Sequence, residues 1–472
     1  MDNRTRTSSM QHVMSSSTGL RRTMHTRDAV MVAVGGTIGT GLFLSSGDVI
    51  AAAGPGGAIL AYLFGGLVIY LMTACLGEMA ASMPVAGNIQ AYCTEYINPE
   101  MGITVGWLSW LANALTITAQ LAASAIIMKN IFPDAPEGLW IVLFAIMLFG
   151  INLFGAGNFG NISFYFASLK LILVLIFTIL GLGMIFFDVG GGENTGFQLF
   201  LSDGLFPRGL GAVGSVILSA FYAFGGIEML ASTGGELHKE ADMPKVINWT
   251  LAILVITYVI SMVMLGALLP WQQADLNGSP FAYVFRNAGM TYGELLVNIF
   301  VLTSALTSCN YFIYASTRYM WSLSRYGQAP KVLSKTRKNG VPFLALVISL
   351  LFGLLGIVCQ FFAPDTVYKV LIYLIGGANI FIYIIICMCQ FCFRKRFVAE
   401  GGQVDNLPYR VVFPLTPVLG IIFLMAMLII SLLDPDEAVT FYICIPAYVI
   451  IYLASHIFVK KKGITARNIM SR

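Results

Sequence analysis

The residues with the clearest chemistry lie in two glycine-rich stretches, AVGGTIGTGLF at 33–43 and SAFYAFGGIEML at 219–230. A glycine in a helix costs about 1 kcal/mol relative to alanine, so four glycines and two threonines within seven positions favour an interrupted helix. Such a break exposes backbone N–H and C=O groups. A half-helix that begins near Thr40 directs its positive end toward an anion, and the carbonyls that end the preceding half-helix suit a cation. A site that offers both suits the carboxylate and ammonium of an amino acid.

Close packing between helices is the other explanation for such small residues. It accounts for one or two glycines and poorly for the whole stretch. The second stretch supports an interruption, because Gly225 and Gly226 lie at its middle and Glu228 follows. The two stretches lie about 190 residues apart, which predicts two units of five spans each. An odd number of spans per unit makes the second unit inverted relative to the first.

One lysine, Lys170, lies deep within the apolar stretch SFYFASLKLILVLIF at 163–177. A charged side chain at that depth is costly and normally faces the protein interior, where it finds partners. Snorkelling of the ammonium to the membrane interface is the alternative, but hydrophobic residues flank the lysine on both sides. A lysine held away from water can lose and regain a proton. Lys170 is therefore a candidate for proton coupling.

The composition indicates the elements that must position these residues. Hydrophobic residues make up 57% of the 472-residue chain and charged residues 11%, against roughly 25% charged in soluble proteins. Crossing a bilayer takes about 20 residues, and the spans must be helical because the bilayer core has no water. We therefore predict an all-α polytopic membrane protein. Its twelve transmembrane helices are expected near 28–51, 57–81, 103–131, 138–155, 161–187, 211–236, 248–270, 291–324, 342–362, 367–393, 412–433 and 438–459.

Lysine and arginine are distributed unequally between alternate loops. If the N-terminus is cytoplasmic, the inner segments hold 21 of the 27 basic residues and the outer segments hold four. By the positive-inside rule, both termini are then cytoplasmic. Residues 1–27 and 460–472 are predicted cytoplasmic tails, and the first lacks the features of a signal peptide. The net charge of +4 follows from this topology and gives no indication of nucleic acid binding.

The motifs of catalysis and nucleotide binding are missing from the sequence. There is no G-x-x-x-x-G-K-[ST], so ATP is not expected as a partner, and no H-E-x-x-H or G-x-S-x-G. A G-x-G-x-x-G begins at Gly209 but follows a polar loop instead of a strand, which argues against a nucleotide site. Three of the eight cysteines cluster in CMCQFC at 387–392 without a neighbouring His or acid, so free thiols are favoured over a metal site. We expect no enzyme, no cofactor and no metal.

Several motifs together resemble the amino acid transporter branch of the amino acid–polyamine–organocation superfamily. They are GGTIGTGLF at 35–43, the glycine-rich stretch AGPGG…MPVAG at 53–87, FGGIE at 224–228, ASTRYMWSLSRYGQAPKVL at 315–333 and LPYR at 407–410. The resemblance runs from about residue 20 to 460 and implies a leucine-transporter-type fold. In that fold 28–190 (spans 1–5) and 211–393 (spans 6–10) form a 5+5 inverted repeat with broken helices 1 and 6, and 412–459 holds peripheral spans 11 and 12.

The resemblance also implies a substrate site. Thr40 and Gly41 match positions that bind the substrate carboxylate, and Glu228 matches the acid of an F-x-G-x-[DE] segment. The amine is expected near Thr37 and the backbone of span 6. The full set of substrate-binding residues is Thr37, Gly39, Thr40, Gly41, Tyr222, Gly225 and Glu228.

Lys170 matches a span-5 lysine that occupies the place of a sodium ion in related carriers. Its expected partners are carbonyls near Gly36 and the hydroxyls of Thr307 and Ser308. A fixed ammonium in that place favours a proton as the coupling ion.

Three further polar residues are candidates for the pocket or a gate: Gln120, Glu236 and Asn310. Hydrogen bonding between helices is the alternative role for Gln120 and Asn310, and structural contacts with loops for Glu236. Gln120 stands where the family often has an acid. If that acid selects cationic side chains, its loss weakens an assignment to lysine or arginine.

These observations predict import of an L-amino acid across the plasma membrane by proton symport with alternating access. An amino acid exchanger and a transporter-like sensor are the alternatives. The expected partners are the amino acid and the lipid bilayer. The oligomeric state, and the choice between a cationic and a neutral substrate, stay open.

Overall fold

The computed structural model describes nine segments of the chain: 24–83, 88–153, 159–187, 196–201, 203–230, 237–238, 242–274, 278–357 and 367–462. Apart from one isolated bridge between Met24 and Leu237, their regular structure is helical. The α-helices are α2 (Thr26–Thr37), α3 (Thr40–Phe43), α4 (Ser45–Ser82), α5 (Asn88–Tyr96), α6 (Pro99–Ile131), α7 (Glu137–Leu153), α8 (Phe159–Phe187), α9 (Phe197–Leu201), α10 (Ile217–Tyr222), α12 (Met243–Leu268), α13 (Pro280–Asn287), α14 (Thr291–Arg325), α15 (Phe343–Gly353), α17 (Val367–Ala399), α18 (Leu415–Leu433) and α19 (Pro435–Lys462).

Eight helices of the described residues are long and apolar enough to cross a membrane: α4, α6, α8, α12, α14, α17, α18 and α19. The expected spans at 28–51, 138–155, 211–236 and 342–362 correspond to shorter or interrupted helices, among them α7, α10 and α15. The prediction of a polytopic helical membrane protein is therefore confirmed.

The helices differ in how much of their surface other helices cover. In the most apolar 18-residue stretch of α6, 83% of residues are buried, whereas 17% are buried in the corresponding stretch of α19. Large hydrophobic side chains such as Tyr442, Ile450 and Ile457 are exposed along α19. An apolar surface of that extent is unfavourable in water and is expected where a helix faces lipid tails.

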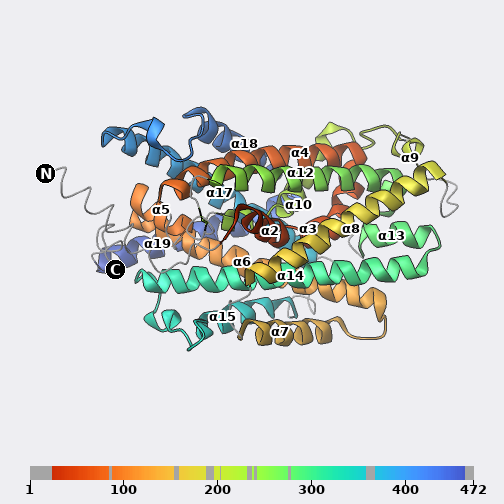
Figure 1. Ribbon diagram of the computed structural model, residues 1–472, viewed down its shortest axis with the longest axis horizontal. Coiled ribbons are helices and arrows are strands. Elements are labelled where there is room, and N and C mark those ends of the chain that lie inside the picture. Colours follow the sequence, from red (N-terminus) through yellow and green to blue (C-terminus); the bar gives the residue numbers. More distant parts are fainter. Residues whose placement is uncertain are drawn as a thin grey trace.

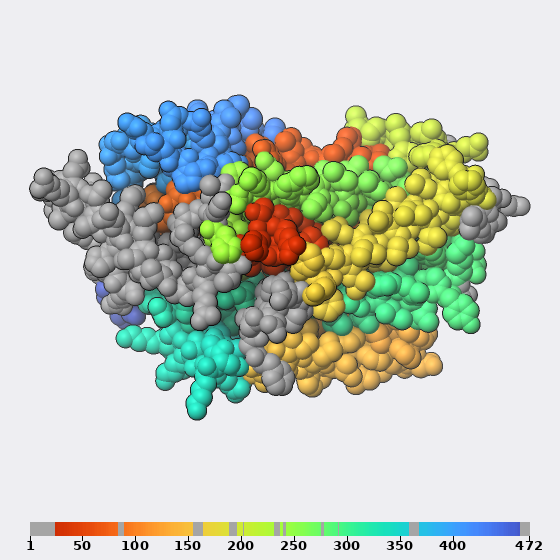
Figure 2. All heavy atoms as spheres, viewed as in Figure 1, coloured from red at the N-terminus to blue at the C-terminus, as the bar shows by residue number. Residues whose placement is uncertain are grey.

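The long helices α4, α12 and α14 run roughly along the long axis of the molecule, with α2, α3 and α10 between them near its centre (Figure 1). α2 packs against α8, α12 and α14. In the space-filling view, the start of the described chain (red) lies between α8 (yellow) and α12 (green) (Figure 2). The two glycine-rich stretches therefore lie in the interior of the helix bundle.

Two features of the helices differ from the sequence expectation. The expected loop between the first two spans is a kink, because Gly54 adopts a left-handed conformation (φ 72°) and Pro55 follows it within the continuous element α4. A positive φ favours glycine, and proline cannot donate a backbone hydrogen bond at the bend. Short helices also occur outside the expected spans, namely α5, α9 and α13.

A buried ion pair joins the end of α4 to α17. Arg394 donates to both carboxylate oxygens of Glu78 at 2.7 and 2.5 Å, and both side chains are buried. The same carboxylate accepts from the Gln390 side chain and from the Val411 N–H. Glu78 thus has a structural role, because it joins α4, α17 and the segment that precedes α18.

Candidate substrate and coupling site

The first glycine-rich stretch leaves helical geometry where the sequence predicts. α2 ends at Thr37, Ile38 is extended (φ −69°, ψ 106°), and Gly39 adopts φ −144° and ψ −144° before α3 begins at Thr40. We call Ile38–Gly39 the first break. Its residues are fully or almost fully buried, so backbone polar groups are exposed to the protein interior instead of to water.

The second glycine-rich stretch is also interrupted. α10 ends at Tyr222, and Gly226 adopts a left-handed conformation (φ 93°) before a short 3-10 helix at Ile227–Met229. We call Ala223–Gly226 the second break. Only glycine adopts this conformation readily, which explains the residue type at position 226.

The two breaks lie against each other. The hydroxyls of Thr40 and Tyr222 form a hydrogen bond at 3.0 Å. A Cβ atom at Gly41 would lie 2.5 Å from the Cα atom of Ala223, so the two backbones approach as closely as a glycine permits. The structure thus brings together Gly39, Thr40, Gly41 and Tyr222, four of the seven residues predicted for the substrate.

Lys170 reaches the first break from α8. Its amine donates to the carbonyls of Gly35 and Ile38, both at 2.6 Å, and to the Ser308 hydroxyl at 2.9 Å. The lysine is 3% exposed, so snorkelling to an interface does not describe it. The amine therefore connects the end of α2 and the first break to α8 and α14.

The two neighbouring hydroxyls predicted as partners of Lys170 differ. Ser308 contacts both the amine and the Ile38 carbonyl, the latter at 2.8 Å. Thr307 instead donates within α14 to the carbonyls of Thr303 and Ser304, so its expected contact with the amine is wrong. A cavity of about 10 Å³ between α8 and α14 is lined by Lys170, Thr303 and Thr307 among others.

Glu228 is buried beside the second break. Its Oε2 atom accepts hydrogen bonds from the Gly226 N–H at 3.1 Å and from the Tyr383 hydroxyl at 2.9 Å. Gly225 lies near the Asn379 side chain of α17. The carboxylate is thus bound to the backbone of the turn that carries both glycines.

The remaining predicted residues fall into different places. The Gln120 amide lies against Gly39, where an added Cβ would come within 2.8 Å of Nε2, and its Oε1 atom has no partner among the described residues. The Thr37 hydroxyl is likewise buried without a partner there. Asn310 accepts a hydrogen bond from Asn152 of α7 at 2.6 Å, which is the interhelical role. Glu236 lies outside the described residues.

Sequence reasoning did not select the tyrosines that surround both breaks. The hydroxyls of four of them donate to carbonyls of the breaks or of the adjoining residues: Tyr62 to Gly41, Tyr258 to Ala223, Tyr311 to Gly226 and Tyr368 to Thr40. The Tyr311 ring also packs on Gly36, where an added Cβ would lie 2.6 Å from it. The sequence did contain an indication of these contacts. A tyrosine within an apolar span carries a hydroxyl, and a buried hydroxyl needs an acceptor.

The apolar helices with two interior breaks define a polytopic integral membrane protein with a buried polar centre. The chain belongs to the amino acid permease family of the amino acid–polyamine–organocation superfamily, since the family model for amino acid permeases matches residues 28–465. It is accordingly a transport protein and not an enzyme, and the resemblance noted in the sequence is confirmed.

Its relatives are bacterial permeases of similar length. The amino-acid permease RocE of Bacillus subtilis (strain 168) is 34% identical over 448 residues, which cover 94% of this chain and 96% of RocE. The lysine-specific permease LysP of Lactococcus lactis subsp. cremoris (strain MG1363) is 34% identical over 474 residues, with 96% and 93% covered. The aromatic amino acid transport protein AroP of Escherichia coli (strain K12) is 32% identical over 443 residues, with 94% and 96% covered.

Proposed function

We propose that this permease imports an L-amino acid across the plasma membrane by proton symport with alternating access. The observation that carries the proposal is the position of Lys170, whose amine is bound to the carbonyl of Gly35 in the last turn of α2 and to that of Ile38 in the first break. The proposed coupling ion is a proton, and the proposed partners are the amino acid and the lipid bilayer.

The proposed architecture has twelve spans. Residues 28–190 and 211–393 would form the 5+5 inverted repeat, 412–459 the two peripheral spans, and 1–27 and 460–472 the cytoplasmic tails. Two observations support it: the paired breaks lie in the spans that the repeat makes equivalent, and α19 has a largely exposed apolar surface.

The substrate is proposed to lie between the two breaks. Its carboxylate would meet the N-terminal end of α3 at Gly39, Thr40 and Gly41, because the first N–H groups of a helix have no acceptor one turn earlier. Its amine would lie near Thr37 and the backbone of the second break at Tyr222 and Gly225. Glu228 would affect substrate binding indirectly, because its carboxylate bonds to the Gly226 N–H in the turn of the second break.

Proton coupling follows from the contacts of Lys170. An ammonium forms charge-assisted hydrogen bonds that are roughly twice as strong as neutral ones. In the proposed cycle, loss of the proton to the inside weakens the link between α2, α8 and α14, and this favours a change between the outward-facing and inward-facing states. A ligand shifts such an equilibrium only through its different affinity for the two states, and here the proton is that ligand.

The test is uptake into proteoliposomes by Lys170→Met, which keeps a long apolar stem but cannot bind a proton. We expect accumulation driven by a pH gradient to be lost while amino acid binding or exchange survives. Thr307→Val is the matched control, because this residue lines the same cavity and its hydroxyl bonds only within α14. Full gradient-driven accumulation by Lys170→Met, or wild-type uptake that needs sodium and ignores the pH gradient, would refute the proposal.

The side chain of the substrate is tested separately. The names of the relatives include a lysine-specific permease, a histidine permease and an aromatic amino acid transport protein, so we propose an amino acid substrate without restriction to one class. A thermal-shift screen of the twenty proteinogenic L-amino acids on the purified protein identifies it. If no amino acid stabilises the protein, the proposed site is wrong.

A further inference from the structure

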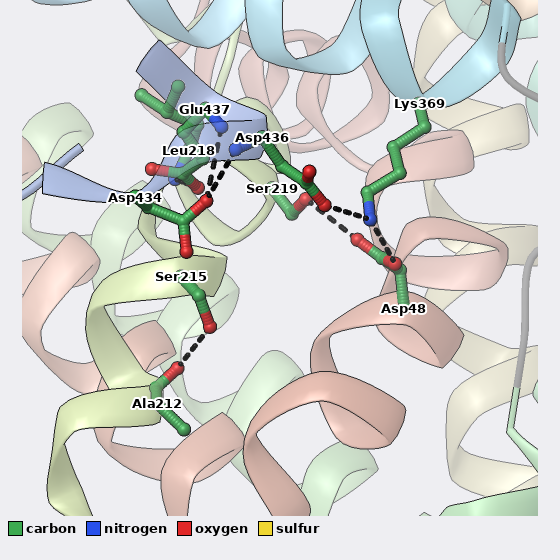
Figure 3. Close-up of polar contacts among 9 residues, drawn as sticks. All are labelled: Asp48, Ala212, Ser215, Leu218, Ser219, Lys369, Asp434, Asp436 and Glu437. Atoms are coloured by element: carbon green, nitrogen blue, oxygen red, sulfur yellow. Dashed lines mark hydrogen bonds and ion pairs between the residues drawn. The ribbon is translucent and has the colours of Figure 1, made fainter. Parts of the chain in front are cut away.

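Two carboxylates hold α10, the short helix that precedes the second break, from different sides (Figure 3). The Asp48 side chain of α4 accepts a hydrogen bond from the Ser219 hydroxyl at 3.2 Å. The Glu437 side chain of α19 accepts one from the Leu218 N–H, also at 3.2 Å. One of these carboxylates therefore comes from a helix that is otherwise mostly exposed.

Glu437 is fully buried and lies in the first turn of α19. The Asp434 side chain accepts hydrogen bonds from the N–H groups of Asp436 and Glu437 at 3.0 and 3.2 Å. This is the arrangement of a helix N-cap, which satisfies N–H groups that lack intrahelical partners. Asp434 thus fixes the start of α19 and, with it, the backbone from which the Glu437 carboxylate extends.

The contact with Leu218 lies at the start of α10, where a carboxylate is favourable. α10 continues directly from a 3-10 helix at Leu210–Val216, whose Gly214 carbonyl accepts from the Ile217 N–H, whereas the next N–H, that of Leu218, donates to Glu437. α10 has six residues, so it forms few hydrogen bonds of its own and its position depends on contacts from outside. On the other side, Gly376 of α17 approaches so closely that an added Cβ would lie 2.9 Å from the Leu218 carbonyl oxygen.

The other charges of this cluster contribute less to holding α10. Lys369 lies 3.8 Å from Asp48 and 3.5 Å from Asp436. Its side chain is 32% exposed and that of Asp436 is 75% exposed, and exposed ion pairs are worth little because water and salt screen them. The contact that burial strengthens is the one between Glu437 and Leu218.

The effect of this contact reaches the proposed substrate site within one helical turn. Tyr222 follows Leu218 by four residues at the end of α10, and its hydroxyl bonds to Thr40. A shift of α10 would move the Tyr222 hydroxyl relative to Thr40. We propose that Glu437 is a positioning residue for substrate binding, which holds α10 from α19 so that Tyr222 closes the site against Thr40. This inference rests on the proposed function, because it takes Thr40 and Tyr222 to line the substrate site.

The test measures equilibrium binding to the full-length purified protein at one fixed pH. The probe is whichever of the twenty L-amino acids the wild-type protein binds most tightly. We expect Glu437→Leu to raise the Kd at least about fivefold, because the buried Leu218 N–H loses its acceptor. Glu437→Asp, which shortens the side chain by one methylene, is expected to weaken binding similarly. Glu437→Gln keeps an acceptor oxygen and should restore the Kd to within about twofold of the wild type.

Thr440→Val is the matched control. Thr440 lies on the same buried side of α19, one turn beyond Glu437, but packs against Gly377 of α17. The Kd of Thr440→Val should stay within about twofold of the wild-type value, since this substitution leaves the contact between Glu437 and Leu218 in place. A Kd raised as much as in Glu437→Leu would show a general effect of α19 and overturn the inference.

A double-mutant cycle with Tyr222→Phe tests the route. If Glu437 acts through Tyr222, the double variant Glu437→Leu/Tyr222→Phe should bind no more than about twofold more weakly than the weaker single variant. Independent losses that multiply, or unchanged binding in both Glu437→Leu and Glu437→Asp, would overturn the inference. If Glu437→Leu does not insert into the membrane, Glu437→Asp and Glu437→Gln decide. An unchanged Kd in Tyr222→Phe would refute the proposed substrate site itself, and this failure is distinguishable because it occurs in a different single variant.

Discussion

Substitution of Glu228 by glutamine tests how the second break is held. The Oε2 atom of Glu228 accepts one hydrogen bond from the Gly226 N–H and one from the Tyr383 hydroxyl. A hydrogen bond to a charged group contributes about 1.5–3 kcal/mol and a neutral one about 0.5–1.5 kcal/mol. Glutamine keeps an acceptor of the same shape, so the variant exchanges two charge-assisted bonds for neutral ones and loses about 2 kcal/mol from the turn. Since about 1.4 kcal/mol is tenfold in affinity, the upper limit is a Kd raised by about 30-fold.

We expect the Kd to rise at least about fivefold. This is less than the upper limit because the substitution also weakens the turn in the unbound protein, and only the difference between the bound and unbound states changes the affinity. Equilibrium binding of the best-bound amino acid, measured across a range of pH, is the assay. Tyr383→Phe is the companion variant: it removes one donor and keeps the carboxylate, and because the lost bond to a charged group is worth about 1.5–3 kcal/mol, it should weaken binding to a similar extent. If Glu228→Gln alters neither the Kd nor its pH dependence, the carboxylate has no part in the substrate site.

Two further predictions concern the close approach of the two breaks and the buried ion pair. Gly41→Ala should abolish uptake and lower the melting temperature of the inserted protein, because the added Cβ would meet the backbone of Ala223; normal uptake would show that the two breaks need not approach so closely. Arg394→Met leaves Glu78 buried and unpaired and should destabilise the protein by about 3–5 kcal/mol, whereas Arg396→Met, at a 42% exposed side chain, should change stability by less than about 1 kcal/mol. Similar melting temperatures for these two arginine variants would contradict the assignment of the buried pair.

The sequence was sufficient for the features that follow from backbone chemistry. Glycine in an apolar span is unfavourable unless the chain leaves the helix, and the structure has both breaks at the predicted glycines. A lysine in such a span needs acceptors, and the carbonyls of the first break are the acceptors of Lys170.

The features that the sequence left undecided depend on the rotation and spacing of helices. Thr307 and Ser308 are adjacent, so their side chains point about 100° apart around α14, and only the packing of α14 on the first break selects Ser308. Gln120 and Asn310 are equally plausible from their types, yet the first lies at Gly39 and the second bonds to Asn152. The sequence predicted a loop at Gly54 and Pro55, where the structure has a kink within α4, because glycine and proline occur in loops and in kinks alike.

The hydrogen bonds of the two breaks indicate which backbone groups remain for a ligand. The carbonyls at and beside the breaks have partners: Gly35 and Ile38 bind the Lys170 amine, and tyrosine hydroxyls donate to Thr40, Gly41, Ala223 and Gly226. An ammonium donates but cannot accept, so the Lys170 amine satisfies carbonyls and no N–H group. The first N–H groups of α3 need an acceptor that their own helix does not supply, and a buried N–H without an acceptor costs about as much as a lost hydrogen bond. Protein side chains thus satisfy six carbonyls at and beside the breaks, and a carboxylate suits the N–H donors at the start of α3.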